Sequence, residues 1–142
     1  MYLSDPAAEA EYLALLQAED YDLAEKSLSH FIKAAWSVLE PGKEYLHNWH
    51  VDAICEYLEA VRLGQIRKLI INMPPRSMKS IAVTVCFPVW YWLQDPTKQF
   101  LCGSYSGVLS TKHNVDRRTL ILSPRFQLAW SKRFRMAKDQ NQ

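Results

Sequence analysis

The strongest constraint on the fold is a thirteen-residue run, 81–93, that contains no charged side chain. It is too short to span a bilayer, which takes about 20 residues, and it contains Pro88. A helix that is apolar nearly all round lies inside a fold and packs on both sides. We therefore predict that residues 79–93 form a buried helix, and we expect Pro88 to kink it.

The segments around this helix predict an α/β arrangement. Residues 68–72 form a short apolar run, typical of a strand that is buried on both faces, and residues 99–103 form a second such run. The order strand, loop, helix, strand, helix predicts parallel pairing with right-handed crossovers. We therefore expect an α/β fold, a partial parallel sheet with flanking helices, preceded by an amino-terminal helical segment.

The other predicted helices follow from apolar spacing and from start and stop residues. Ser4-Asp5-Pro6 is a helix start, and the cluster Glu19-Asp20-Tyr21-Asp22 is expected to end the helix that follows. Pro41-Gly42 and Gly64 are expected to end two more. The remaining predicted helices cover residues 23–39, 49–63, 108–122 and 124–130.

Composition and charge narrow the class of protein. With 142 residues, 49% of them apolar and 23% charged, the chain has the composition of a globular domain, which argues against disordered and fibrous classes. Residues 1–43 carry eight acidic and three basic side chains, whereas residues 112–138 carry eight basic and one acidic. The basic stretch would either face a polyanion or form a solvated helix face.

Cysteine use and the amino terminus indicate location. An odd number of cysteines with apolar neighbours suggests reduced, buried thiols at Cys55, Cys86 and Cys102, in an intracellular protein. The first twenty residues are acidic and show no signal peptide. We therefore expect a protein that is neither secreted nor inserted in a membrane.

Residues 70–80, Ile-Ile-Asn-Met-Pro-Pro-Arg-Ser-Met-Lys-Ser, have several features of a phosphate-binding loop. Such a loop needs backbone N–H groups at a helix amino terminus, a lysine for the terminal phosphates and a hydroxyl for magnesium. Lys79-Ser80 supplies the last two. In the common form Gly-x-x-x-x-Gly-Lys-Ser/Thr, both glycine positions are methionine here, Met73 and Met78, and a positive φ there would be strained. Taken alone, Lys79-Ser80 more often marks an ordinary loop.

The neighbouring residues change that interpretation. Pro74-Pro75-Arg76-x-x-Lys79-Ser80 resembles the deviant Walker A motif of phage terminase large subunits, in which Pro-Pro-Arg takes the place of the first glycine. Met78 departs from the family, since a glycine commonly precedes the lysine. The resemblance covers residues 28 to 142 and includes, in the expected order, Asn48-Trp49-His50, Val61–Gly64, Phe87–Trp90, Phe100–Ser106, Arg118–Pro124 and Asp139–Asn141.

The resemblance implies a role for each residue of the loop. Lys79 would hold the β and γ phosphates of ATP, and Arg76 would lie over the phosphates and act with Lys79 in catalysis. Ser80 would ligate Mg²⁺. Trp49 and His50 are candidates for flanking the adenine ring, although Trp49 packing its helix onto the core is at least as good an interpretation. The cofactors would be ATP and Mg²⁺, and the nucleotide pocket would be lined by Pro74, Pro75, Arg76, Ser77, Met78, Lys79 and Ser80.

The family also implies a domain organisation and a function. Residues 1–46 would be an amino-terminal helical segment and 47–142 an incomplete P-loop ATPase domain, ending before the acidic Walker B strand and without the nuclease domain. The whole family protein is an ATPase with a metal-dependent endonuclease domain, and a ring of copies packages double-stranded DNA into capsids. Its partners are the portal and the small terminase subunit, and it works in the host cytoplasm, transiently at the capsid portal.

The sequence limits this expectation and leaves alternatives open. No apolar run ending in Asp-Asp or Asp-Glu follows Lys79, so we expect the chain to bind ATP without hydrolysing it unaided. One alternative is another P-loop translocase, such as a helicase-like ATPase. Another is a non-catalytic module whose acidic helices bind a partner. His47 and His50 lack further ligands for a metal site, and Arg117 and Arg118 are candidates for reaching a neighbouring subunit's phosphate.

Overall fold

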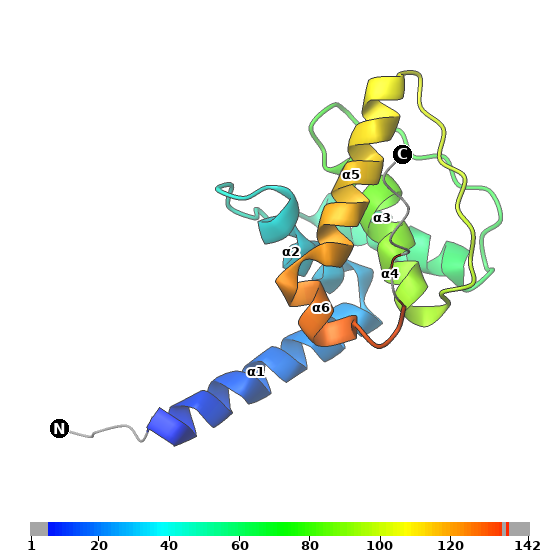
Figure 1. The fold of residues 1–142 in the computed structure, drawn as a ribbon. Helices are drawn as coiled ribbons and strands as arrows, with labels where there is room; N and C mark the ends of the chain where they lie inside the picture. Colours follow the sequence, from blue (N-terminus) through cyan, green and yellow to red (C-terminus); the bar gives the residue numbers. More distant parts are fainter. Residues whose placement is uncertain (1–5, 135, 137–142) are drawn as a thin grey trace.

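A computed structural model describes residues 6–134 and 136 of the chain. Within them the regular structure is entirely helical (Figure 1). Helices α2, α3, α4, α5 and α6 and the π-helix η1 form the body, and α1 extends away from it. In chain order the elements are α1 (Pro6–Lys26), α2 (Leu28–Leu39), α3 (Trp49–Arg62), η1 (Ile81–Cys86), α4 (Phe87–Gln94), α5 (Gly107–Leu122) and α6 (Pro124–Trp130).

The expected α/β fold is wrong, because no strand or sheet forms among the residues that the structure describes. Residues 68–72 and 99–103 lie in two long connections that border the helices, and within the described chain no backbone hydrogen bond joins either segment to another. A strand is defined by its ladder partner, and these segments have none. Residues 68–72 are also not buried on both faces, since Leu69 and Ile71 contact the core while Ile70 is 85% exposed.

The first two helices divide at a different residue from the one predicted. The cluster Glu19–Asp22 does not end α1, which continues to Lys26 with an ion pair from Lys26 to Asp22 at 2.7 Å. The break comes at Ser27, whose backbone is extended. The first N–H group of α2, at Leu28, donates to the Glu59 carboxylate of α3 at 2.8 Å. This contact satisfies one of the free amides at the amino terminus of α2 with a negative charge.

Helix α3 begins and ends almost as predicted. The Asn48 side chain accepts a hydrogen bond from the N–H group of Trp49, which starts the helix. Gly64 follows the helix with φ of +75°, a conformation that glycine adopts without strain. The predicted helices near 108–122 and 124–130 are present as α5 and α6, separated by Ser123, whose hydroxyl accepts from the N–H group of Phe126.

The central helix is buried as predicted, but its first half is a π-helix. The N–H group of Phe87 donates to the carbonyl of Ala82, five residues earlier. Pro88 has no N–H group, so the carbonyl of Thr84, four residues earlier, lacks its usual helical donor. The Arg117 guanidinium on α5 donates to that carbonyl at 3.0 Å. A side chain from a neighbouring helix thus bonds a carbonyl that Pro88 cannot serve at the usual helical spacing.

One hydrophobic core joins all parts of the helical body. Helix α2 packs against α3, η1 and α5, and the buried residues run from Ala24 to Trp130. Trp90, Val89 and Leu93 of α4 are almost fully buried within it. None of the helices in the described part of the chain has the length and hydropathy needed to cross a membrane.

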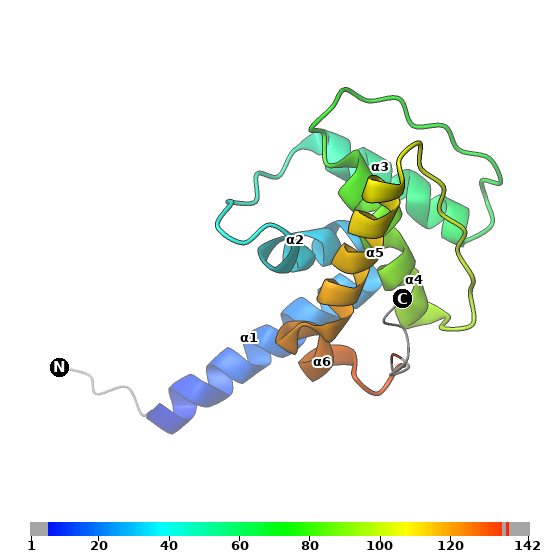
Figure 2. The same ribbon diagram turned by 45° about the horizontal axis from the view of Figure 1, so that its top comes forward.

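Glu25, at the end of α1, connects the first helix to the last one. Its carbonyl accepts from the indole N–H of Trp90 at 2.9 Å and from Gln94 at 2.7 Å. Its carboxylate accepts from the indole N–H of Trp130 at 3.2 Å and from Arg133 at 2.5 Å. Figure 2 shows the end of α1 near α4 and α6. These contacts fix the root of α1, while the rest of that helix leaves the body.

The three cysteines differ in burial. Cys55 and Cys86 are buried free thiols, as expected from their apolar neighbours, and burial raises the pKa of Cys55 to about 12. Cys102 is exposed, contrary to expectation, because the segment that carries it is not covered by a sheet neighbour.

Candidate functional site

The candidate phosphate loop, residues 73–80, connects an extended segment to the start of the central helix. The first helical hydrogen bond after the loop runs from the N–H group of Ala82 to the carbonyl of Met78, at 2.9 Å. The N–H groups that precede Ala82 therefore have no helical acceptor and are available to an anion. This part of the sequence-based interpretation, a loop that opens a helix at Lys79, agrees with the observed structure.

The loop backbone has two left-handed residues. Arg76 has φ of +65° and Met78 has φ of +61°, a conformation that costs a residue with a side chain about 1–2 kcal/mol. Met78 occupies the position where the common motif has its second glycine. The backbone therefore takes the conformation that suits glycine although the residue is methionine. Pro74 and Pro75 lie exposed at the outer part of the turn.

Lys79 folds back across the loop. Its Nζ atom donates to the carbonyl of Met73, at the other end of the loop, over 3.5 Å. This distance is at the long limit for a hydrogen bond, so the contact is weak and easily exchanged for a stronger acceptor. A phosphate oxygen is such an acceptor, because charge-assisted hydrogen bonds are shorter and about twice as strong.

Two hydroxyl groups accompany this lysine. The Oγ atom of Ser77 is buried and has no hydrogen-bond partner among the described residues. Buried polar atoms are normally paired, so this hydroxyl can bond a ligand atom or a water molecule that reaches it. Ser80 is exposed at the start of the helix. The donor set around the loop therefore has one lysine, two hydroxyls and free backbone amides.

The fit to Mg²⁺ is limited to one hydroxyl. Among the described residues, no group of three or more His, Cys, Asp or Glu side chains could hold a metal ion. Magnesium is commonly bound through substrate phosphates and water with few protein ligands. Ser80 fits that pattern as a single ligand.

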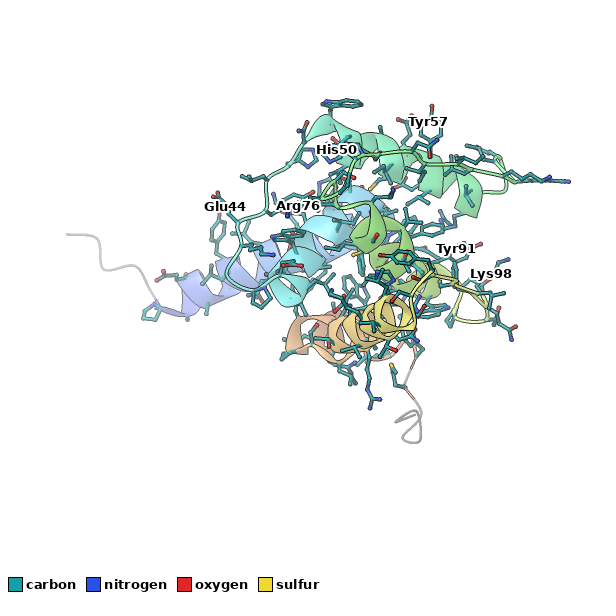
Figure 3. All side chains as sticks on the ribbon, turned by 90° about the horizontal axis from the view of Figure 1, so that it is seen from above. Glu44, His50, Tyr57, Arg76, Tyr91 and Lys98 are labelled. Atoms are coloured by element: carbon teal, nitrogen blue, oxygen red, sulfur yellow. The ribbon has the colours of Figure 1, made fainter. Side chains whose placement is uncertain are left out.

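The two residues proposed to flank adenine lie at the start of α3. Trp49 is 76% exposed, so the alternative interpretation, that it packs α3 onto the core, is wrong. Its ring meets the edge of His50 at a centroid distance of 6.3 Å. The Nε2 atom of His50 is buried and has no hydrogen-bond partner among the described residues. In Figure 3, His50 and Arg76 project to the same side of the molecule, away from Tyr91 and Lys98.

His47 takes part in a hydrogen-bonded chain that the sequence did not indicate. Its Nε2 atom lies 2.7 Å from Asp52, and the Tyr45 hydroxyl lies 3.3 Å from its Nδ1 atom. The Ser29 hydroxyl donates to the other oxygen of Asp52 at 2.7 Å. The hydrogen bond from Ser29, and then the contact with His47, lower the pKa of Asp52. These hydrogen bonds order the connection between α2 and α3. The sequence does not indicate them, because Ser29 and Asp52 are 23 residues apart.

Other sequence-based candidates have structural contacts. Arg117 bonds Thr84 and also contacts Asn114 and Cys102, so its guanidinium is used within the chain. The turn around Ser104 has a local hydrogen bond from the N–H group of Ser106 to the Ser104 hydroxyl, at 3.3 Å. The segment 139–141, part of the family resemblance, lies outside the described residues.

Comparison with known proteins gave no match to a family model, a curated protein or a solved structure. The arrangement of the loop can hold an anion between a lysine, a helix amino terminus and two hydroxyls.

Proposed function

We propose that the loop Met73–Ser80 binds the phosphates of ATP, and that the chain is the amino-terminal part of a viral terminase large subunit. Lys79 neutralises and orients the terminal phosphates. The N–H groups at the start of the helix point at the same anion, where the helix dipole favours negative charge. Arg76, exposed on the turn, adds a second positive charge.

One observation carries the proposal: Lys79 reaches back over its own loop to a weak acceptor, the carbonyl of Met73. A surface lysine with no partner in the protein would extend its amino group into water. Here the amino group is already directed across the loop, at the carbonyl of Met73. The left-handed φ at Met78, the glycine position of the motif, also supports the proposal. These features lie in the loop and in the helix after it.

Magnesium would enter with the nucleotide. When bound, Mg²⁺ supplies positive charge between the phosphate oxygens. Ser80 would hold it with its hydroxyl. In the longer protein that this proposal implies, ATP hydrolysis would drive double-stranded DNA into a capsid, with the portal and small terminase subunit as partners.

Binding of a fluorescent ATP analogue to the 142-residue chain tests the proposal. We expect saturable binding in the presence of Mg²⁺, and a loss of about 10- to 100-fold in affinity in Lys79→Ala, because hydrogen bonds to charged groups contribute about 1.5–3 kcal/mol. Ser80→Ala should lower the affinity in Mg²⁺ more than in EDTA.

Lys68→Ala is the matched control, since Lys68 is exposed on the segment before the loop. It should bind the analogue as the unaltered chain does. Equal binding by the unaltered chain and Lys79→Ala would contradict ATP binding at this loop. Equal loss in Lys68→Ala and Lys79→Ala would show that only general charge attracts the nucleotide.

A further inference from the structure

The helix that follows the phosphate loop starts with a π-helical turn. In η1, the N–H group of Phe87 donates to the carbonyl of Ala82, five residues earlier, where an α-helix would use the residue four earlier. Each bonded turn of η1 therefore contains one more residue than a turn of α-helix. The loop is attached directly to this turn, because the N–H group of Ala82 donates to the carbonyl of Met78. Single π-helical turns inside helices are frequent at functional sites.

Pro88 opposes an α-helical form of this turn. In a regular α-helix its ring would clash with the carbonyl of Thr84, four residues earlier, and its nitrogen could not donate to that carbonyl. A wider turn directly before the proline relieves the clash. Pro88 is also less than 2% exposed, so the core holds its ring in place.

Arg117 of α5 bonds the same turn from the neighbouring helix. Helix α5 packs against η1 (Figure 1), and the guanidinium donates to the carbonyl of Thr84 at 3.0 Å, across 33 positions of the sequence. Asn114, three residues earlier on α5, accepts from this guanidinium, and the Cys102 sulfur lies 3.2 Å from it. Because hydrogen bonds from a charged donor are stronger than neutral ones, Arg117 stabilises the turn in its observed form.

We infer that Pro88 and Arg117 position the phosphate loop by holding η1 in its π-helical form. One residue corresponds to about 100° of rotation in an α-helix with 3.6 residues per turn. If η1 became α-helical, the residues before it would turn by about that angle relative to α4, whose side chains are fixed in the core. Lys79 would then lose its direction across the loop towards Met73. This role rests on the proposed binding of ATP at the loop.

Arg117 acts on the loop through the helix. Among the described residues its hydrogen bonds go to Thr84, Asn114 and Cys102, and none goes to the loop 73–80. It is therefore a positioning residue. If Arg117 only stabilised the fold, its substitution would lower the free energy of unfolding and leave the ATP affinity of the folded chain unchanged.

Nuclear magnetic resonance couplings across hydrogen bonds identify the carbonyl that accepts from the Phe87 N–H group. We expect Ala82 in the unaltered chain. In the double variant Pro88→Ala/Arg117→Ala we expect Val83, the α-helical acceptor, because both residues that oppose the α-helical form are gone. The affinity of this variant for a fluorescent ATP analogue in Mg²⁺ should fall about 10-fold, which corresponds to the loss of one hydrogen bond to a charged group.

The single variants separate positioning from stability. Arg117→Ala alone should change the affinity less than 3-fold, because Pro88 still opposes the α-helical form, whereas in the Pro88→Ala background it should cause most of the roughly 10-fold loss. The loss of stability should show the opposite order, since the new N–H group at residue 88 can bond Thr84. An affinity that follows stability in both backgrounds would overturn the positioning role.

The controls assign the other outcomes. Lys112→Ala removes an exposed ion pair with Asp116 on the same helix and should change neither the acceptor nor the affinity. Pro88→Ala/Arg117→Met keeps aliphatic packing at residue 117 and should give the same results as the alanine double variant. Equal binding by the unaltered chain and Lys79→Ala would contradict ATP binding itself. Binding that depends on Lys79, with an unchanged acceptor or an unchanged affinity in both double variants, would overturn only the positioning role.

Discussion

Arg76 holds a left-handed backbone without compensation from its side chain, which is exposed. Arg76→Gly and Arg76→Ala both remove the charge, but only glycine removes the Cβ strain. We expect Arg76→Gly to be more stable than Arg76→Ala by about 1 kcal/mol, as for other positions with positive φ. Urea unfolding of the two variants measures this difference. Equal stabilities would show that φ at residue 76 is not positive in solution.

Cys102 is expected to be the one thiol that reacts in the folded protein. The thiolate is the reactive form, and burial raises the pKa of Cys55 and Cys86. A thiol-specific reagent should modify one cysteine per native chain and all three in urea. Cys102→Ser should remove the native reaction. Rapid native modification of Cys55 or Cys86 would contradict the burial seen here.

Single residues also show how far the sequence could predict the candidate site. The motif predicted that Lys79 starts a helix, because lysine, serine and an apolar helix are local features. It did not predict that Trp49 is exposed, because the apolar character of a tryptophan does not show whether its helix face is covered. The sequence also did not predict that polar atoms of Ser77 and His50 are buried without a hydrogen-bond partner, since such pairing depends on neighbours distant in the sequence.

Helices were predicted better than strands for a physical reason. A helix forms its hydrogen bonds within itself, so spacing and terminal residues suggest α3, α5 and α6. A strand needs another strand, and residues 68–72 and 99–103 have the apolar character without a partner. Among the described residues, no other segment forms backbone hydrogen bonds with either of them.

The hydrogen bond from Arg117 of α5 to Thr84 of the π-helix can be tested by substitution. Arg117→Ala would remove the hydrogen bond to the part-buried carbonyl of Thr84, which costs about 1–3 kcal/mol. In Pro88→Ala, the new N–H group at residue 88 can bond Thr84, so Arg117→Ala should cost less in that background. Thermal or urea unfolding of the single and double variants gives the coupling. Lys112→Ala, on the same helix, is the control and should cost less than about 0.5 kcal/mol.

The acidic amino-terminal segment and the basic carboxy-terminal segment of the sequence contact each other in the folded molecule. The basic stretch was expected to face a polyanion or water. Part of it instead pairs with the acidic first helix, since Arg125 contacts Asp20 and Arg133 contacts Glu25. These contacts join residues more than 100 positions apart. They could not be predicted from composition, which gives the sign of each segment but not which segments meet.

Glu25 should therefore contribute to the stability of the whole molecule more than its place at a helix end suggests. Glu25→Ala removes the acceptor of the part-buried indole N–H of Trp130 and the partner of Arg133. We expect a loss of about 1–3 kcal/mol in the free energy of unfolding, because a part-buried donor is left unpaired. Asp22→Ala breaks only an exposed ion pair with Lys26 and should cost about 0–0.5 kcal/mol. If the two variants unfold at the same urea concentration, Glu25 does not join the first helix to the last in solution.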